Sequence, residues 1–261
     1  MIQLQNMKYL QNKTILAILV VAVLILAGGL MYVVSGKKNL VETSESIIVN
    51  ESIVENITNS DSNQTTNQNS NPKDESLSVE KSFNTYKTAI LARDGELAAM
   101  YVNNETISYY SDLLKLIKFG TKNEIQSKRL VDKFTVLSIR LRFGNEITNI
   151  KDGKSLLSFA VKKGLIGEQG VSGLKYSSVN ISGDLAFVTL EVNNAISPMK
   201  FKFTKENSVW KIDLVEILPS ANIAFSYAAE ESGYSDDEFI FMVLESLSGI
   251  KPTEKIWEPL N

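Results

Sequence analysis

Apolar and polar residues are segregated along this chain of 261 residues. Residues 15–34 form a run without a charged side chain, whereas residues 58–71 are polar at every position and cannot bury enough apolar surface to offset their ordering entropy. Beyond residue 76, apolar positions recur with the spacings of helices and strands. We therefore predict four segments: a short head (1–13), a transmembrane helix (14–35), a disordered polar tether (36–75) and one soluble domain (76–261).

The run Ile15–Val34 is long enough to contact and span a lipid bilayer, because a hydrocarbon core about 30 Å thick needs about 20 helical residues. The alternatives are a buried helix of a soluble protein and a signal peptide that is cleaved near Ser35. Lys and Arg nearly balance at the two ends of the run, but neither occurs between Lys38 and Lys73. Since positive residues favour the cytoplasmic side, we expect a single-pass membrane protein. Its N-terminus would lie inside and its C-terminal domain outside, at a bacterial cell surface.

Helical periodicity dominates the first half of the predicted domain. We expect Asn104 or Thr106 to cap a helix that ends at Gly120, and the capping box from Thr121 to Glu124 opens the next one. Residues 134–143 fit both a helix and a strand, and we expect a helix. The other predicted helices run from Phe83 to the Asp94-Gly95 break, from Glu96 to Val102, and from Asp152 to Lys163 before Gly164.

The pattern then changes to period two, which is typical of strands. Four segments are predicted as strands: Tyr176–Ser182, Leu185–Val192, Met199–Thr204 and Val209–Ile217. Gly183-Asp184 predicts a hairpin turn, and Lys205–Asn207 predicts another reversal. Trp210 shares one strand face with Ile212 and Leu214, so we expect it to anchor the core.

Two further helices are predicted after Pro219, at Ala221–Glu231 and at Asp236–Ser248, where Ser235 opens a second capping box. The order of elements is helices, meander, helices. We therefore predict an α+β fold in which helices pack on one side of an antiparallel four-stranded meander.

The segments Tyr86–Tyr101 (YKTAILARDGELAAMY) and Phe203–Leu214 (FTKENSVWKIDL) carry a resemblance to a known family. The first resembles the opening helix, break and short helix of the nuclear-transport-factor-2-like superfamily, and the second resembles its final strand pair. The resemblance covers about residues 79–103 and 175–218, and it implies a cone-like fold with an internal pocket. Residues 104–170 are longer and more helical than the middle of that family, and the two C-terminal helices are extra.

The chain contains no cysteine and no histidine, which excludes disulfides, thiolate or imidazole catalysis, and Cys/His zinc sites. The resemblance implies that enzymatic members place an Asp, a Tyr and often a His inside the cone. The candidate pocket residues of this chain are Tyr86, Tyr101, Tyr110 and Phe203. Tyr109 could also reach a pocket, with Asp112 or Asp213 as a carboxylate base. The simpler interpretation places the tyrosines in the core and both aspartates in solvent, and we expect no metal and no cofactor.

Charged residues are unevenly distributed. Residues 115–163 contain twelve Lys or Arg against four Asp or Glu, and residues 206–258 contain three against eleven. We expect these basic and acidic stretches to pack together and neutralise each other. The alternative is a bipolar surface for a protein partner or for self-association. Nucleic acid is not an expected partner, because the chain is acidic overall and the basic stretch contains few aromatic residues.

These observations predict a membrane-anchored, non-enzymatic module that binds a protein or a small ligand outside the cytoplasm. One alternative is a carboxylate/tyrosine enzyme of the polyketide-cyclase-like or dehydratase-like kind, which would need a pocket with convergent polar groups. The other alternative is an assembly factor that is tethered to the membrane and faces the cytoplasm.

Overall fold

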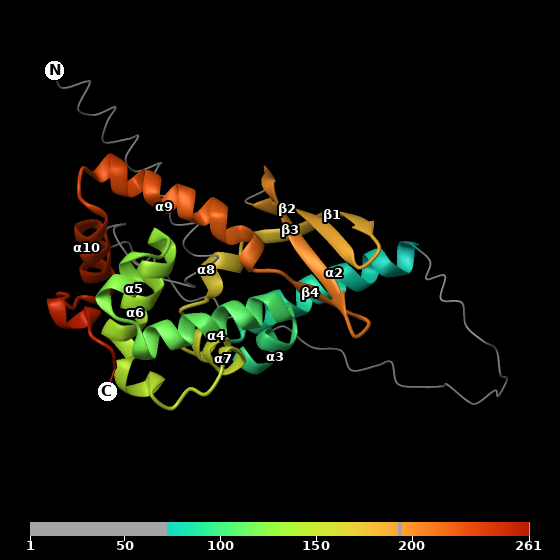
Figure 1. The fold of residues 1–261 in the computed structure, drawn as a ribbon. Helices are drawn as coiled ribbons and strands as arrows, with labels where there is room; N and C mark the ends of the chain where they lie inside the picture. Colours follow the sequence, from blue (N-terminus) through green and yellow to red (C-terminus); the bar gives the residue numbers. More distant parts are fainter. Residues whose placement is uncertain (1–71, 193–194, 261) are drawn as a thin grey trace, which may run out of the picture.

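The computed structural model of the chain describes residues 72–192 and 195–260 (Figure 1). The predicted head, the predicted membrane span and all but the last four residues of the predicted tether lie outside these residues. Among the helices in the described part, none combines the length and the apolar character that crossing a bilayer requires.

The fold is α+β, as the pattern predicts: helices pack against one antiparallel sheet. The helices before the sheet are α2 (Pro72–Leu91), α3 (Gly95–Met100), α4 (Asn104–Phe119), α5 (Lys122–Gln126), α6 (Leu130–Ile147), α7 (Gly153–Lys162) and α8 (Glu168–Val171). The elements after the sheet are the 3-10 helix η1 (Val215–Ile217), α9 (Leu218–Ser232), α10 (Asp236–Ser248) and the 3-10 helix η2 (Glu254–Trp257). The first helix begins at Pro72, where a proline costs no helical hydrogen bond.

The sheet is a simple meander whose strands lie in the order β1-β2-β3-β4. Its strands are β1 (Leu174–Ser182), β2 (Leu185–Val192), β3 (Ala195–Glu206) and β4 (Val209–Ile212). The first hairpin turns at Gly183, with φ +59°, and the last turns at Asn207 and Ser208, with φ +50° and +64°. Two successive residues with positive φ give the turn the twist that a tight hairpin needs. A parallel bridge between Val102 and Ile212 extends the sheet beyond β4.

One face of the sheet packs on α2, which runs along it and contacts β1 and β4 (Figure 1). The buried face includes Val188, Phe203 and Trp210, and they belong to one continuous core that reaches into the helices. Trp210 is 1% exposed, which confirms it as a core residue. Its indole N–H donates to Oε2 of Glu75 on α2, at 2.9 Å, so the same residue fixes the start of the first helix to the sheet.

The last strand is shorter than the alternation predicts, because it ends at Ile212 instead of Ile217. Asp213 accepts hydrogen bonds from the backbone N–H groups of Val215 and Glu216, which begins η1 in place of further strand. The prediction that Asp213 faces solvent is therefore wrong: it is 1% exposed. Its other carboxylate oxygen lies 3.0 Å from Nζ of Lys202, and this partner raises the pKa of Lys202.

Residues 134–143 are helical, as predicted, and belong to α6. The pattern there is ambiguous because neighbours cover α6 on most sides: it contacts α4, α9 and α10. Positions that read as the polar face of a strand, such as Ser138 and Arg140, are therefore buried as well. A non-helical residue, Phe143, kinks the helix near its end.

Both predicted capping boxes, at Thr121 and at Ser235, are present. The predicted cap of α4 is wrong, because its N-cap is Asn103 and neither Asn104 nor Thr106. Asn103 has extended backbone dihedrals, and its side-chain oxygen accepts from the Thr106 backbone N–H and hydroxyl, at 2.9 and 2.7 Å. The Thr106 hydroxyl accepts in turn from Leu214 N–H, so this cap also joins α4 to the end of the sheet.

Candidate binding cleft

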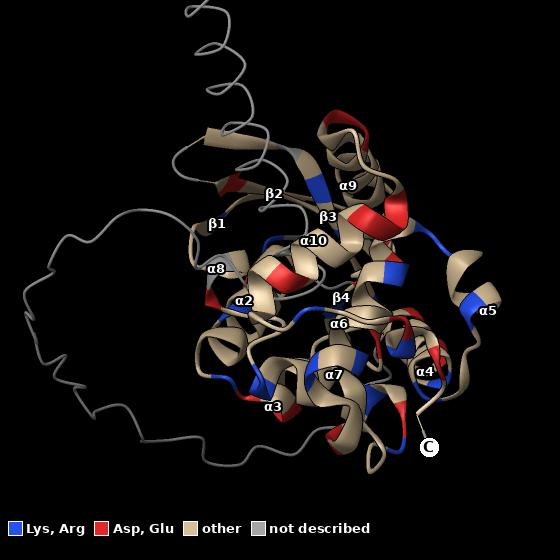
Figure 2. Ribbon diagram, turned by 90° about the vertical axis from the view of Figure 1, so that its left-hand side faces the viewer, with Lys and Arg blue, Asp and Glu red and all other residues tan. Residues whose placement is uncertain are grey.

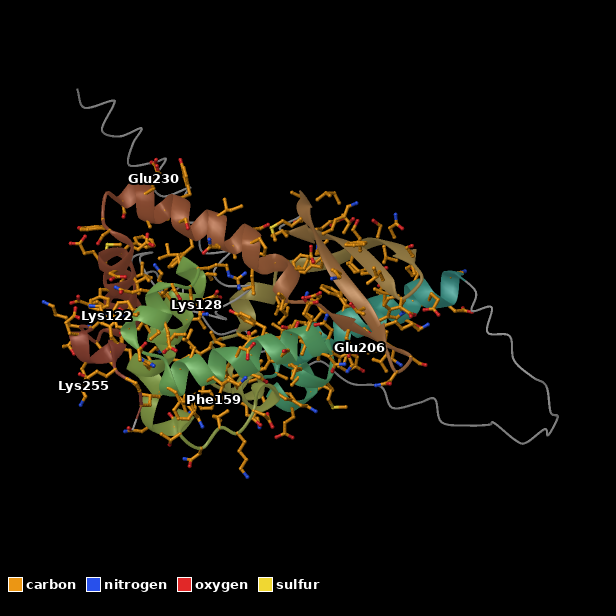
Figure 3. All side chains as sticks on the ribbon, in the orientation of Figure 1. Lys122, Lys128, Phe159, Glu206, Glu230 and Lys255 are labelled. Atoms are coloured by element: carbon orange, nitrogen blue, oxygen red, sulfur yellow. The ribbon has the colours of Figure 1, made fainter. Side chains whose placement is uncertain are left out.

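An open cleft of about 410 Å³ lies between α4, α5 and the start of α6. This volume is in the range of small-molecule sites, which is about 300–1,000 Å³. The cleft is lined by Tyr109, Asp112, Leu113, Lys115, Leu116, Phe119, Gly120, Glu124, Lys128, Arg129 and Asp132. Lys128 lies in the short connection between α5 and α6 and marks this side of the molecule in Figure 3.

One wall of the cleft is apolar and comes from α4. Leu113, Leu116 and Phe119 recur at three-residue spacing, which places them along one side of the helix. Leu113 is buried, Leu116 is half-buried and Phe119 is 68% exposed at the rim. An exposed phenylalanine next to one buried and one half-buried leucine gives the cleft an accessible apolar surface.

Buried Arg140 closes the C-terminal end of α4. Its guanidinium donates to the backbone carbonyls of Ile117 at 2.8 Å, Leu116 at 3.0 Å and Gly120 at 2.7 Å, and also to Ile256 at 3.3 Å. Burial lowers the pKa of Arg140 to about 10, so the group stays a cation at neutral pH. A cation at a helix C-terminus satisfies carbonyls that have no partner within the helix. Arg140 therefore holds in place the C-terminal end of α4, which carries the apolar wall of the cleft.

A hydrogen-bonded array of three residues joins α4 to the start of α6 at the edge of the cleft. The Tyr109 hydroxyl donates to Oδ1 of Asp132 at 2.7 Å, and Arg129 Nε donates to Oδ2 of the same carboxylate at 2.8 Å. Burial and the adjacent Asp132 raise the pKa of Tyr109. The phenol is therefore neutral at ordinary pH, and the charge of Asp132 is paired with Arg129. This array holds α4 and α6 together and leaves no free base.

The remaining charged groups of the cleft differ in how far they are engaged. Asp112 pairs with Lys115 at 2.9 Å, and both side chains are more than 70% exposed. The Glu124 carboxylate accepts from the Thr121 backbone N–H and hydroxyl, which lowers the pKa of Glu124. The ammonium of Lys128 forms no ion pair or hydrogen bond with any residue of the described part, but its positive charge also helps to lower the pKa of Glu124.

The four residues predicted to line an internal pocket do not share one cavity. Tyr86 borders a space of about 20 Å³ between α2 and the sheet, and Tyr110 borders another of about 20 Å³ beneath α6 and α7. Each space has room for about one water molecule and is too small for a larger ligand. Tyr101 is half-buried, and Phe203 is fully buried in the core. Burial raises the pKa of Tyr86 and of Tyr110. A role of these four residues in ligand binding stays a prediction.

The tyrosine that does reach a cleft is Tyr109, but its carboxylate partner is neither of the two predicted. Asp112 faces solvent as expected, and Asp213 is buried at the end of β4, where it accepts from the backbone N–H groups of Val215 and Glu216. The partner is Asp132, which the sequence analysis missed. The available signal was Arg129 three residues before Asp132 in the first turn of a helix, a spacing that favours an ion pair.

The basic and acidic stretches of the sequence are in contact. Lys122 pairs with Glu254 at 2.8 Å, and Lys133 pairs with Asp236 at 3.1 Å. Lys and Arg of α5 and α6 and acidic residues of α9 and α10 accordingly lie in one half of the molecule (Figure 2). Both pairs include an exposed carboxylate, so each contributes only about 0–1 kcal/mol.

Comparison of the chain with known protein families, with curated proteins and with solved structures finds no match. The resemblance to the nuclear-transport-factor-2-like superfamily therefore stays a prediction. The cleft between α4, α5 and α6 is an accessible concavity of ligand size that combines an apolar wall with charged groups, and a second, more open one of about 560 Å³ lies along α2.

Proposed function

We propose that this chain is a single-pass membrane protein whose α+β domain lies outside the cytoplasm and binds a ligand or a protein partner in the cleft between α4, α5 and α6. One observation carries the proposal: the cleft has about 410 Å³ and a 68%-exposed phenylalanine at its rim. Exposed aromatic residues beside a concavity are typical of recognition surfaces.

The membrane anchor in this proposal rests on the sequence. Twenty consecutive residues without a charge, Ile15–Val34, match the thickness of a bilayer. The chain between this run and α2 is rich in Asn, Ser and Thr, and a flexible chain of this length spans on the order of 30–35 Å. The tether would hold the domain away from the lipid surface and keep the cleft accessible.

Recognition fits the polar groups of the cleft better than proton transfer does. A general base needs an unpaired group that can accept a proton near neutral pH. The carboxylate of Asp132 is engaged by Tyr109 and Arg129, and Tyr109 is held neutral. We also propose, from the resemblance, that the sheet and α2 form a cone-like half of the domain, supported by the packing of α2 along the sheet.

Two measurements test this function. Protease added to intact cells should digest the domain, because the proposal places it outside the cytoplasm. A domain that faces the cytoplasm would be digested only after the cells are lysed. Backbone amide NMR of the isotope-labelled domain, with a library of small fragments, should show shifts that cluster at α4, α5 and the start of α6. Fragment-induced shifts that cluster elsewhere, or a domain that is protected in intact cells, would contradict the proposal.

A further inference from the structure

The strand β1 forms an open edge of the sheet. The strands lie in the order β1-β2-β3-β4, and the bridge from Val102 to Ile212 extends the sheet on the β4 side. Beyond β1, no strand of residues 72–192 or 195–260 continues the sheet. An open edge presents backbone N–H and C=O groups that can pair with an extended chain. This edge is therefore a surface to which one more strand can be added.

The backbone groups that β1 turns outward follow from its hairpin. Ser182 and Leu185 flank a two-residue turn and are partners in the ladder. Antiparallel partners alternate between pairs that exchange hydrogen bonds and pairs that do not, and the pair next to a two-residue turn exchanges them. Val179 and Ile181 lie at the intervening positions, so their N–H and C=O groups point away from β2. These groups have no hydrogen-bond partner among the described residues.

The part of β1 next to the turn lacks the features that usually protect an edge. Natural edges are blocked by charged side chains, by proline or by a bulge. In β1, Lys175 and a bulge between Tyr176 and Ser178 both lie near the start of the strand. Residues 178–182 (SVNIS) contain no charge and no proline, and Asn180 is exposed. This stretch can therefore pair with another strand without burying a charge.

The chain itself contains a suitable segment. Residues 47–54 (IIVNESIV) lie outside the described residues, and five of the eight are Ile or Val, which favour strands. Residues 55–71 separate them from Pro72 at the start of α2. A flexible linker of this length spans on the order of 20–25 Å. The start of α2 lies beside β1, because Ser76 Oγ is 3.4 Å from the Tyr176 hydroxyl oxygen. The segment is therefore within reach of the edge.

We propose that residues 47–54 add to the sheet as a further strand along the outer side of β1. Backbone hydrogen bonds to Val179 and Ile181 would carry the pairing. The tethered segment has an advantage over a second copy of the chain, because a short flexible linker gives an effective concentration in the millimolar range. Pairing would cover both an open edge and a β-branched segment, each of which otherwise promotes aggregation. In the membrane-anchored chain proposed above, pairing would shorten the tether and hold the domain closer to the bilayer.

Disulfide trapping tests the pairing, because the chain contains no cysteine of its own. Asn180→Cys, at an exposed position, is combined with a second cysteine at each position from 47 to 54 in turn, in the full chain in lipid nanodiscs. After mild oxidation and alkylation, mass spectrometry measures the fraction of linked pairs. Strand pairing brings facing Cα atoms to about 4.5–5.5 Å, within the range of a disulfide. We expect alternate positions to link about tenfold faster than their neighbours, because successive side chains of a strand point to opposite faces.

The matched control combines Asn180→Cys with Ser60→Cys, which lies in the polar tract and closer to α2 along the chain than residues 47–54. Random encounters would favour Ser60→Cys, because a shorter loop closes more readily. Strand pairing predicts the opposite order. The pairing is refuted if no position from 47 to 54 links faster than Ser60→Cys, or if linking declines smoothly along the chain without alternation. Covalent dimers as the main product, with Asn180→Cys alone as well, would also refute it and would assign the edge to a second copy of the chain.

Discussion

Arg140 offers the sharpest test of how the cleft is held together. Replacement by Met keeps the length and the apolar stem of the side chain but removes every donor. The Leu116 carbonyl would retain its bond from Gly120 N–H, at 2.9 Å. The carbonyls of Ile117, Gly120 and Ile256 would lose the donor that Arg140 supplies in the described structure.

The magnitude follows from these three carbonyls. A buried polar group that loses its partner costs about 1–3 kcal/mol, and removal of a buried cation returns part of that cost, because the cation no longer has to be desolvated. We therefore expect Arg140→Met to lower the free energy of unfolding by about 3 kcal/mol. For a domain of this size, 1 kcal/mol corresponds to about 2–4 °C in melting temperature. The expected fall is about 6–12 °C.

The assay is thermal and urea unfolding of the domain from Pro72 to Asn261, followed by circular dichroism. The matched control is Arg142→Met, two positions along the same helix. Arg142 is half-buried, and its guanidinium lies 4.9 Å from the Phe143 ring centroid. Loss of this cation–π contact should cost about 0.5–1 kcal/mol. Equal destabilisation by the two variants would refute the argument that carbonyl capping, and not charge or bulk alone, makes Arg140 important.

Three further predictions concern the packing around the cleft and the sheet. Gly95→Ala should destabilise the domain by about 3 kcal/mol, because a Cβ there would lie 2.1 Å from the Ser158 carbonyl oxygen and separate α3 from α7. The control, Gly144→Ala, should be near neutral in the same melting assay, because its Cβ would meet only a leucine methyl group at 3.2 Å. Similar losses of stability for both variants would count against the close contact of α3 with α7. Glu75→Leu should lower the free energy of unfolding by about 1–3 kcal/mol, since it leaves the buried indole N–H of Trp210 without this acceptor. Hydrogen exchange should show faster opening of the first turns of α2. Unchanged exchange there would argue against this role of Glu75. Ser208→Gly should raise the free energy of unfolding in urea by about 0.5 kcal/mol, because glycine tolerates the positive φ of the hairpin turn. A loss of stability would contradict that reasoning.

Local signals in the sequence determined much of the secondary structure. The capping boxes at Thr121 and Ser235 and the turn at Gly183 act over two to four residues, so they operate regardless of the rest of the fold. The period-two alternation also predicts the four strands correctly, because one face of the sheet is covered and the other is open. The predictions fail where a local interaction competes with the pattern, as at Asp213, which ends β4 by bonding the backbone after it.

Only the tertiary structure decided the cleft. Tyr109 and Asp132 are separated by 23 residues, and they meet because α4 and α6 pack side by side. The hydrogen bonds from Arg140 to the carbonyls at the end of α4 depend on the same packing, and no spacing in the sequence indicates them. Periodicity reports which face of a segment is apolar, but not which other segment covers that face. The accessible concavity arises from that choice of neighbours, so only the folded domain brings Lys128 and Phe119 to the lining of one cleft.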